Sequence, residues 1–332
     1  MNYIDMHCDT LAKAWLGGEK TAKRLQGTMV DVERLRKSGA KAQFFAMFLP
    51  QKREDGWFLP EQEGGRFSME QLGQAVEGMY LVYCDTMEAC KDSIAPACCY
   101  ADFQKNWSEG KISAFLTIEN GHPVSGKIEN IERFYGMGVR LITLTWNDAN
   151  CLGYPHSADQ KEMERGLTKF GREAVAYMET RGILVDVSHL SDGGFYEVAD
   201  IVKGPFVASH SNCRALAPAT RNLTDEMIRV LAEHGGVAGL NFAPGFLNGS
   251  EGDKVSRIER MCDHVGHLIR VGGAECAAIG TDFDGIEGQF EISDCTGMEL
   301  LFHALRRRGL SGDMLEGLAW RNAARVIKEA VK

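Results

Sequence analysis

The chain has 332 residues, of which 44% are hydrophobic and 25% charged, values that exclude a disordered, collagen-like or coiled-coil protein. Asp and Glu number 46 against 37 Lys and Arg, so the formal net charge is −9 at pH 7. An acidic chain with no basic stripe is a poor partner for nucleic acid or an anionic membrane. Among the longest apolar runs is Phe44–Leu49, far short of the roughly 18 residues that a membrane span needs.

The first residues, MNYIDMHCDT, enter a strand-like segment at once and lack the charged and apolar regions of a secretion signal. The 10 cysteines are scattered along the chain and form no CxxC pair. We therefore expect a cytoplasmic protein with reduced thiols, and neither a disulfide framework nor a structural cysteine zinc site.

Eight short segments have the composition of buried strands, because they are apolar or β-branched and are bounded by turn residues. Near-continuous apolar runs of this kind are typical of parallel strands that are covered on both faces. In chain order the predicted strands are Tyr3–Cys8, Lys41–Leu49, Ile112–Glu119, Val139–Thr145, Leu184–His189, Phe206–His210, Val237–Phe242 and Cys276–Asp282.

Helical patterns lie between these strands. Thr168 and Thr224 occupy N-cap positions, and Gly182 and Gly235 follow the ends of the same two helices. The predicted helices include Ser68–Cys90, Ile128–Gly136, Thr168–Thr180, Thr224–His234 and Ser256–Val271.

Eight strands alternating with helices predict an α/β fold, a (β/α)8 TIM barrel. No Pro- or Ser-rich linker divides the chain, so residues 1–332 are expected to form a single domain. The residues after about 297 are expected to form closing helices, in keeping with a barrel of this size. The polar stretch Pro50–Arg66 is long enough to form a flap beside a site.

The predicted strands end in residue types that bind metals. His7 and Asp9 are two residues apart at the end of the first strand, so they point to the same side. Four other strands end in Glu119, His189, His210 and Asp282. Catalytic groups of such barrels come from the C-terminal ends of different strands, so these six side chains are predicted to meet at one rim.

Imidazole and carboxylate ligands together suit zinc or a similar divalent ion. Six such groups exceed the three protein ligands of a single catalytic zinc, so two divalent ions are expected, with Glu119 bridging them. His7 and Asp9 then bind one ion, and His189 and His210 bind the other. A water shared by two ions is acidic enough to act as the nucleophile at neutral pH.

Each of these residues also has a simpler interpretation. Glu119 could cap a turn, and Asp282 and Asp284 could form Asx turns. His264 and His267 lie three apart in a predicted helix and are expected on the outer surface of the barrel. His122 and His156 lie in loops on the site side, and either could contact a substrate. The convergence of independent strand ends on one rim favours the metal site over the simpler interpretations.

Several motifs follow one another along the chain: MHCDT, IENGH, GVRLITLTWN, GLTKFGREAVAYMETRGILVDVSHLSD, ASHSNCRALAPATRN and GTDFDG. This series, which ends in LAWRNAARVI, resembles the membrane (renal) dipeptidase family of the amidohydrolase superfamily. The resemblance implies a binuclear zinc dipeptidase that cleaves L-Xaa–L-Xaa dipeptides and accepts a D-residue at the C-terminal position. It also implies a homodimer.

The resemblance implies the same ligand sets as the strand ends, with His7 and Asp9 on one zinc, His189 and His210 on the other, and Glu119 between them. Arg221 matches the arginine that grips the carboxylate of the substrate, a task suited to its planar fork. Asp282 matches the acidic residue that shuttles a proton from water to the leaving amine.

Trp146 departs from the family pattern, in which many members have histidine after Leu-Thr. That histidine is thought to help bind the substrate carbonyl or the tetrahedral intermediate, whereas Trp146 can only donate through its indole N–H. Asn147 and Asn150 are the candidates for the missing donor. The change leaves the metal ligands intact and bears on substrate range and rate.

Two alternative functions stay open. A related metal-dependent amidohydrolase could act on N-acyl amino acids or lactams, and Arg221 argues against substrates that lack a free carboxylate. A barrel that binds metal without catalysis is the second alternative, and the retention of all five ligands together with Asp282 argues against it.

Overall fold

Eight parallel strands close into the predicted barrel. The computed structural model of the chain describes residues 1–50, 67–250 and 252–332. Strand β10 pairs with β1, and β2 pairs with β4, so the ring closes on itself. In order around the ring the strands are β1 (Tyr3–Cys8), β2 (Ala40–Phe48), β4 (Ile112–Glu119), β5 (Val139–Thr143), β6 (Leu184–Asp186), β7 (Val207–Ala208), β8 (Val237–Leu240) and β10 (Ala277–Ile279).

Among the described residues, three further strands lie outside the ring, and the sequence pattern did not predict them. Strand β3 (Ile94–Pro96) pairs with the first three residues of β4, whereas β5 pairs with β4 from Leu116 onward. Strands β9 (Val255–Ser256) and β11 (Gln289–Phe290) pair with each other. Segments of two or three residues are too short to show a periodic pattern.

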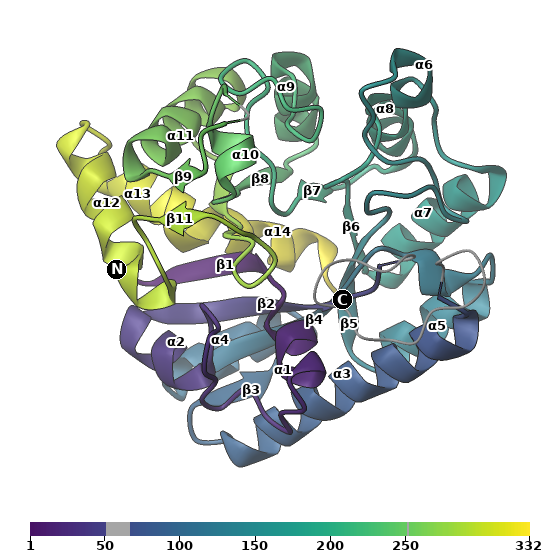
Figure 1. Cartoon of the computed structure of the whole chain (residues 1–332), viewed down its shortest axis with the longest axis horizontal. Helices are drawn as coiled ribbons and strands as arrows, with labels where there is room; N and C mark the ends of the chain where they lie inside the picture. Colours follow the sequence, from purple (N-terminus) through teal and green to yellow (C-terminus); the bar gives the residue numbers. More distant parts are fainter. Residues whose placement is uncertain (51–66, 251) are drawn as a thin grey trace.

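Helices surround the barrel, as Figure 1 shows for α3, α5, α7, α8, α9, α11 and α12. Thr168 and Thr224 are the predicted N-caps, accepting hydrogen bonds from the backbone N–H groups of Gly171 and Met227. The helices are α1 (Thr10–Leu16), α2 (Val32–Ser38), α3 (Met69–Ala89), α4 (Tyr100–Ser108), α5 (Ile128–Gly136), α6 (Gln160–Met163), α7 (Lys169–Arg181), α8 (Asp192–Ile201), α9 (Asp225–Glu233), α10 (Pro244–Leu247), α11 (Ile258–Gly272), α12 (Met298–Arg307), α13 (Gly312–Glu316) and α14 (Asn322–Ala330), with short turns η1 (His122–Val124), η2 (Cys295–Gly297) and η3 (Gly317–Arg321).

Several barrel strands end two or three residues earlier than the sequence predicted. Strand β6 stops at Asp186 and β10 at Ile279, so His189 and Asp282 lie just beyond their strands. Both residues have left-handed backbone angles, with φ of 68° and 62°. An extended strand cannot contain such a residue, because its backbone turns out of the sheet.

The interior of the barrel is apolar at the end opposite the predicted site. Phe44 and Phe115 stack there with ring centroids 4.7 Å apart, and both are fully buried. Apolar residues of α14, including Val326 and Ile327, join the same cluster. The barrel is therefore a packed core closed by its last helix, which leaves the opposite rim for a site.

Among the described residues, no helix is both long enough and apolar enough to cross a membrane. All 10 cysteines are free thiols, and six of them are buried. Apart from Pro50, the flap predicted over Pro50–Arg66 lies outside the described residues.

Candidate metal centre

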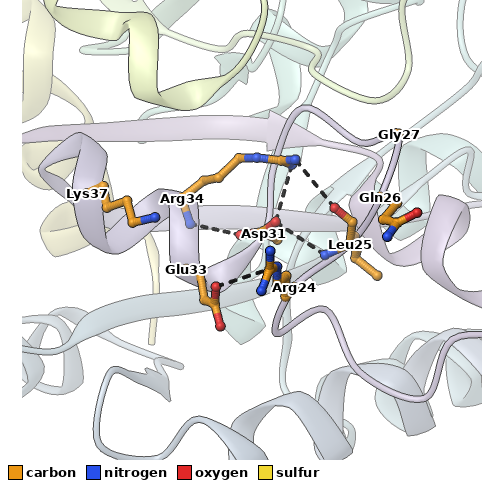
Figure 2. A pocket seen from close by; sticks show the side chains of 8 residues that line it. All are labelled: Arg24, Leu25, Gln26, Gly27, Asp31, Glu33, Arg34 and Lys37. Carbon is orange, nitrogen blue, oxygen red and sulfur yellow. Dashed lines mark hydrogen bonds and ion pairs between the residues drawn. The ribbon is translucent and has the colours of Figure 1, made fainter.

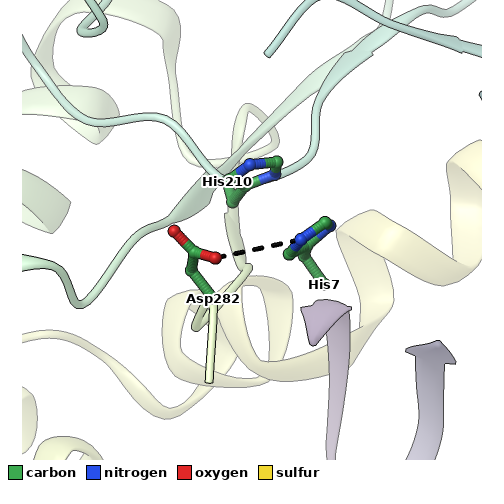
Figure 3. Close-up of side chains that lie close together, drawn as sticks. All are labelled: His7, His210 and Asp282. Carbon is green, nitrogen blue, oxygen red and sulfur yellow. Dashed lines mark ion pairs between the residues drawn. The ribbon is translucent and has the colours of Figure 1, made fainter. Parts of the chain in front are cut away.

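Six buried side chains meet at the C-terminal rim of the barrel. Their potential ligand atoms form three overlapping groups, and within each group all atoms lie within 4.8 Å of one another. The groups are His7 with Asp9 and Glu119, Glu119 with His189 and His210, and His7 with His210 and Asp282. Figure 3 shows the third group, in which Asp282 Oδ1 lies 3.8 Å from His7 Nε2.

Glu119 stands between the first two groups and turns one carboxylate oxygen toward each. Its Oε2 atom is 3.4 Å from His7 Nε2. Its Oε1 atom is 3.0 Å from His189 Nε2 and 3.5 Å from His210 Nε2. This is the arrangement expected of a carboxylate that bridges two cations.

Several buried atoms of these side chains have no hydrogen-bond partner in the part of the chain that the structure describes: His7 Nδ1 and Nε2, Asp9 Oδ1 and His189 Nδ1. The Nε2 atoms of His189 and His210 lie 3.1 Å apart. Burial lowers the pKa of both rings well below 6.5, and nearby positive groups lower it further, so both are neutral. Of the unpaired atoms, His7 Nε2 faces the cluster, because it lies within 3.8 Å of carboxylate oxygens of Asp9, Glu119 and Asp282. A buried nitrogen left unpaired among carboxylate oxygens fits a divalent cation.

The electrostatics of the cluster also favour cations. Burial, followed by the charge of Asp9, raises the pKa of Glu119 to about 8. Burial raises the pKa of Asp282 to about 6, and Asp9 again contributes. Burial opposes a charge on His7, yet Glu119 and Asp9 raise its pKa well above 6.5. Three carboxylates crowded into a buried site repel one another, and divalent ions offset that repulsion.

Gly285 lies directly against two of these carboxylates. A Cβ atom at this position would stand 2.1 Å from Asp9 Oδ2 and 2.6 Å from Asp282 Oδ1. The last glycine of the GTDFDG motif is therefore needed for space. Asp282 is fixed from its other side, because its Oδ2 atom accepts a hydrogen bond of 2.8 Å from Asn241 Nδ2.

Asp284 lies outside the ligand cluster, and both of its carboxylate oxygens accept hydrogen bonds from other residues. Its Oδ1 accepts from the backbone N–H of Met29 and its Oδ2 from the hydroxyl of Thr10, both at 2.6 Å. Both carboxylate oxygens are thus used to join the loop after β10 to α1 and the segment that follows it.

Arg221 is buried behind His210. Its Nη1 donates to Ser211 Oγ at 2.6 Å, and its Nη2 donates to the carbonyl oxygen of His210 at 3.0 Å. Burial lowers its pKa to about 10, so the guanidinium stays charged at neutral pH, and Asp282 and Glu119 lie close enough to stabilise that charge. Within the described chain its Nε is buried without a hydrogen-bond partner.

Trp146 borders the rim next to His189, with ring centroids 6.2 Å apart, and packs edge-on against Phe48. His156 approaches His189 from another loop, with ring centroids 6.1 Å apart. Asn147 is exposed, and its Oδ1 lies 3.3 Å from His156 Nε2. Trp146, Asn147 and His156 thus form one edge of the site.

Asn150 is bound within its own loop. Its Nδ2 donates to Asn120 Oδ1 and to the carbonyl oxygen of Leu144, and its Oδ1 accepts from the backbone N–H of Leu152. Both ends of the amide are occupied, which is a structural reason to favour Asn147 over Asn150 as the donor near Trp146.

The polar residues that hold the charged ones include two that the sequence pattern did not single out. Asn241 donates to Asp282, and Ser209 Oγ lies 2.7 Å from His210 Nδ1. Both stand at the ends of predicted strands, so extending the strand-end search to uncharged polar residues could have found them.

His264 and His267 are buried, contrary to the expectation of an outer surface. His264 Nδ1 accepts from the backbone N–H of Cys213, and His267 Nε2 lies 2.6 Å from Asp225 Oδ1. The surface expectation was wrong because these two side chains connect α11 to its neighbours.

A cavity of about 500 Å³ lies beside α2 and contains none of the six rim residues (Figure 2). Arg34 Nη1 lies 3.2 Å from Asp31 Oδ2, and Arg24 Nε lies 4.0 Å from Glu33 Oε2. Because its opposite charges pair with one another, this cavity is a weaker candidate site than the rim. It is lined by Arg24, Leu25, Gln26, Gly27, Asp31, Glu33, Arg34 and Lys37.

Comparison with known proteins gives the family. The family model of the membrane dipeptidases, peptidase family M19, matches residues 1–332. The chain belongs to this family. The resemblance seen in the sequence motifs is thereby confirmed, and the protein is a metallodipeptidase of the barrel fold.

Individual relatives agree with this assignment. The chain is 34% identical over 235 residues to an uncharacterized protein in the pqqA 5′ region of Klebsiella pneumoniae, covering 69% of this chain and 86% of that protein. A solved structure described as dipeptidase AC, a metallopeptidase of family M19, shares 26% identity with a TM-score of 0.89, covering 100% and 99% of the two chains. A metallopeptidase of Rhodobacter sphaeroides, solved with a phosphinate mimic of the dipeptide L-Ala-D-Ala, shares 25% identity with a TM-score of 0.88, covering 99% of each chain.

Proposed function

We propose that the protein is a binuclear zinc dipeptidase that hydrolyses L-Xaa–L-Xaa and L-Xaa–D-Xaa dipeptides. The observation that carries the proposal is the position of Glu119, which turns one oxygen toward His7 and the other toward His189 and His210. The dipeptide mimic bound to the Rhodobacter sphaeroides relative supports a D-residue at the C-terminal position.

His7 and Asp9 would hold one ion and His189 and His210 the other, with Glu119 shared. Nitrogen and carboxylate ligands of this kind suit zinc. When bound, the two ions supply the Lewis acidity that activates water and polarises the peptide carbonyl. The buried rim excludes bulk water from the ligands, which strengthens every charge interaction within it.

Asp282 moves the proton in this mechanism. Its Oδ2 is fixed by Asn241, while its Oδ1 faces the ligand cluster beside His7. The free oxygen accepts a proton from the attacking water and delivers it to the leaving amine, which is general base and then general acid catalysis.

Arg221 recognises the C-terminal carboxylate of the substrate. Its charge lies beside the ligand cluster, and its Nε has no hydrogen-bond partner among the described residues. Its two terminal nitrogens hold Ser211 and His210, which fixes the plane of the guanidinium. Trp146 and Asn147 contact the rest of the substrate at the edge of the site. A cytoplasmic location and a homodimer remain predictions.

The decisive experiment is a panel of L-L and L-D dipeptides, N-acyl amino acids and lactams, assayed with metal-depleted and zinc-restored protein. We expect dipeptide hydrolysis that requires metal and returns with zinc, at two ions per chain. Hydrolysis of N-acyl amino acids or lactams without dipeptides would favour the related amidohydrolase. A protein that binds two ions and hydrolyses none of these substrates would be a metal-binding barrel.

A further inference from the structure

Asp186, at the end of β6, is a fully buried carboxylate beneath the metal centre. Its Oδ1 accepts hydrogen bonds from the backbone N–H groups of Ser188 and Ser209 at 3.0 and 2.9 Å. Its Oδ2 accepts from the hydroxyls of Thr143 and Ser209, both at 2.6 Å. Both oxygens therefore act as acceptors, and each accepts from two donors.

Ser209 connects this carboxylate to His210. A serine hydroxyl has one proton, and Ser209 gives it to Asp186. The same oxygen lies 2.7 Å from His210 Nδ1, so the ring nitrogen must be the donor of that hydrogen bond. His210 therefore carries its proton on Nδ1 and has an unprotonated Nε2, which lies 3.1 Å from His189 Nε2 and 3.5 Å from Glu119 Oε1.

The other two histidines of the cluster lack such a contact. Within the described residues, the Nδ1 atoms of His7 and His189 are buried without a hydrogen-bond partner. Of the three rings, His210 is thus the one whose second nitrogen is held by the protein. A held second nitrogen fixes both the tautomer and the orientation of a metal-binding histidine.

We propose that Asp186 and Ser209 are positioning residues that select the metal-binding tautomer of His210 before any ion arrives. This pair sets the affinity of the ion position that His189 and His210 share, without contacting the ion itself. The proposal rests on the proposed metal centre. It gives Ser209 and Asp186, neither of which is a metal ligand, a role in metal affinity.

The substitution Asp186→Asn tests the direction of the hydrogen bonds. Two backbone N–H groups require the amide oxygen, so the amide nitrogen would face Thr143 and Ser209. Ser209 would then accept from this amide and turn its own proton toward His210 Nδ1. This hydrogen bond would favour the opposite tautomer of the ring, with a proton on Nε2 where the ion should bind.

Zinc titration of the full-length protein, by competition with a chelator, measures the effect. We expect Ser209→Ala to weaken one of the two ions by about 10–100-fold and to leave the other unchanged. Asp186→Asn should cause a larger loss at the same ion. In the double variant the loss should return to that of Ser209→Ala, because the connection to His210 is already cut.

The matched control is Ser113→Ala, which removes another fully buried barrel serine. Ser113 accepts a hydrogen bond from Asn106 on α4, so its loss should leave both zinc affinities unchanged. Wild-type zinc affinities in Ser209→Ala, or additive losses in the double variant, would overturn the proposal.

The tautomer can be measured in the wild-type chain without any substitution. Nitrogen NMR of the metal-free protein with labelled histidine should show His210 protonated on Nδ1. Protonation on Nε2 would overturn the proposal even if every variant misfolded. A wild-type chain that binds no divalent ion would overturn the proposed function instead, so the two failures are distinguishable.

Discussion

Glu119 is the residue that both ligand groups share, so its replacement should affect both ions. We predict that Glu119→Gln weakens the two ions together, because an amide cannot offer an anionic oxygen to each of two cations. The metal content of protein purified without chelator should fall from two ions toward none. Loss of one ion with normal affinity for the other would assign Glu119 to a single ion.

Asp282 and Asp284 are two residues apart but have different surroundings. We predict that Asp282→Asn keeps both ions and the fold while kcat falls by about 10²–10⁴-fold, the usual contribution of general acid–base catalysis. The control is Asp284→Asn, since Asp284 bonds Thr10 and Met29 outside the ligand cluster. Asp284→Asn should lower the melting temperature, and it should lower kcat much less than Asp282→Asn does. The reverse pattern would mean that Asp284 is the proton carrier.

The effect of replacing Arg221 on KM should depend on the C-terminal group of the substrate. We predict that Arg221→Met strongly raises KM for free dipeptides and has little effect on dipeptides amidated at the C-terminus, which lack the carboxylate. Arg221→Lys keeps a positive charge but loses the planar fork, so its KM should lie between those of the wild type and Arg221→Met. Equal effects on free and amidated substrates would give Arg221 a structural role, through its bonds to Ser211 and His210.

At the scale of elements, the turn after β10 is shaped by Gly285. We predict that Gly285→Ala weakens metal binding and lowers kcat, because its Cβ would displace the carboxylates of Asp9 and Asp282. Gly73 in α3 is the control, since a Cβ there meets nothing within 4 Å. Gly73→Ala should raise the free energy of unfolding by about 0.5–1 kcal/mol without changing activity. Normal metal content and kcat in Gly285→Ala would show that the two carboxylates can shift without loss.

The elements also show which parts of the molecule the sequence could predict. All eight barrel strands and the caps at Thr168 and Thr224 follow from hydrophobic patterns and local capping chemistry. The strand ends do not, because the left-handed backbone at His189 and Asp282 depends on packing around the site rather than on residue type. Charged residues at strand ends are conspicuous in a sequence, whereas the contact of Ser209 with Asp186 joins two strands and needs the fold to be known.

At the scale of the whole molecule, the metal-free protein should depend on pH through the rim. The pKa of Glu119 is raised from 4.5 to about 8 in the folded state. A carboxyl group of this kind adds stability below pH 4.5, and that stability is lost as the pH rises toward 8. His7, whose pKa is also raised, acts in the same direction. His189 and His210 have lowered pKa values, so through them the stability of the folded state increases as the pH rises. This increase ends once the histidines of the unfolded chain have lost their protons, just above pH 6.5.

The clear window is therefore pH 7 to 8, where the metal-free protein should lose stability as the pH rises, by at most about 1.4 kcal/mol per proton and pH unit. A zinc ion must displace the proton on Glu119, so zinc affinity should increase as the pH rises from 7 to 8. Thermal unfolding of metal-free and zinc-loaded protein should show melting temperatures that move apart from pH 7 to pH 8. Glu119→Gln should reduce this divergence, because its amide does not titrate. If the metal-free protein instead gains stability from pH 7 to 8, the crowded carboxylates at the rim are not what destabilises it.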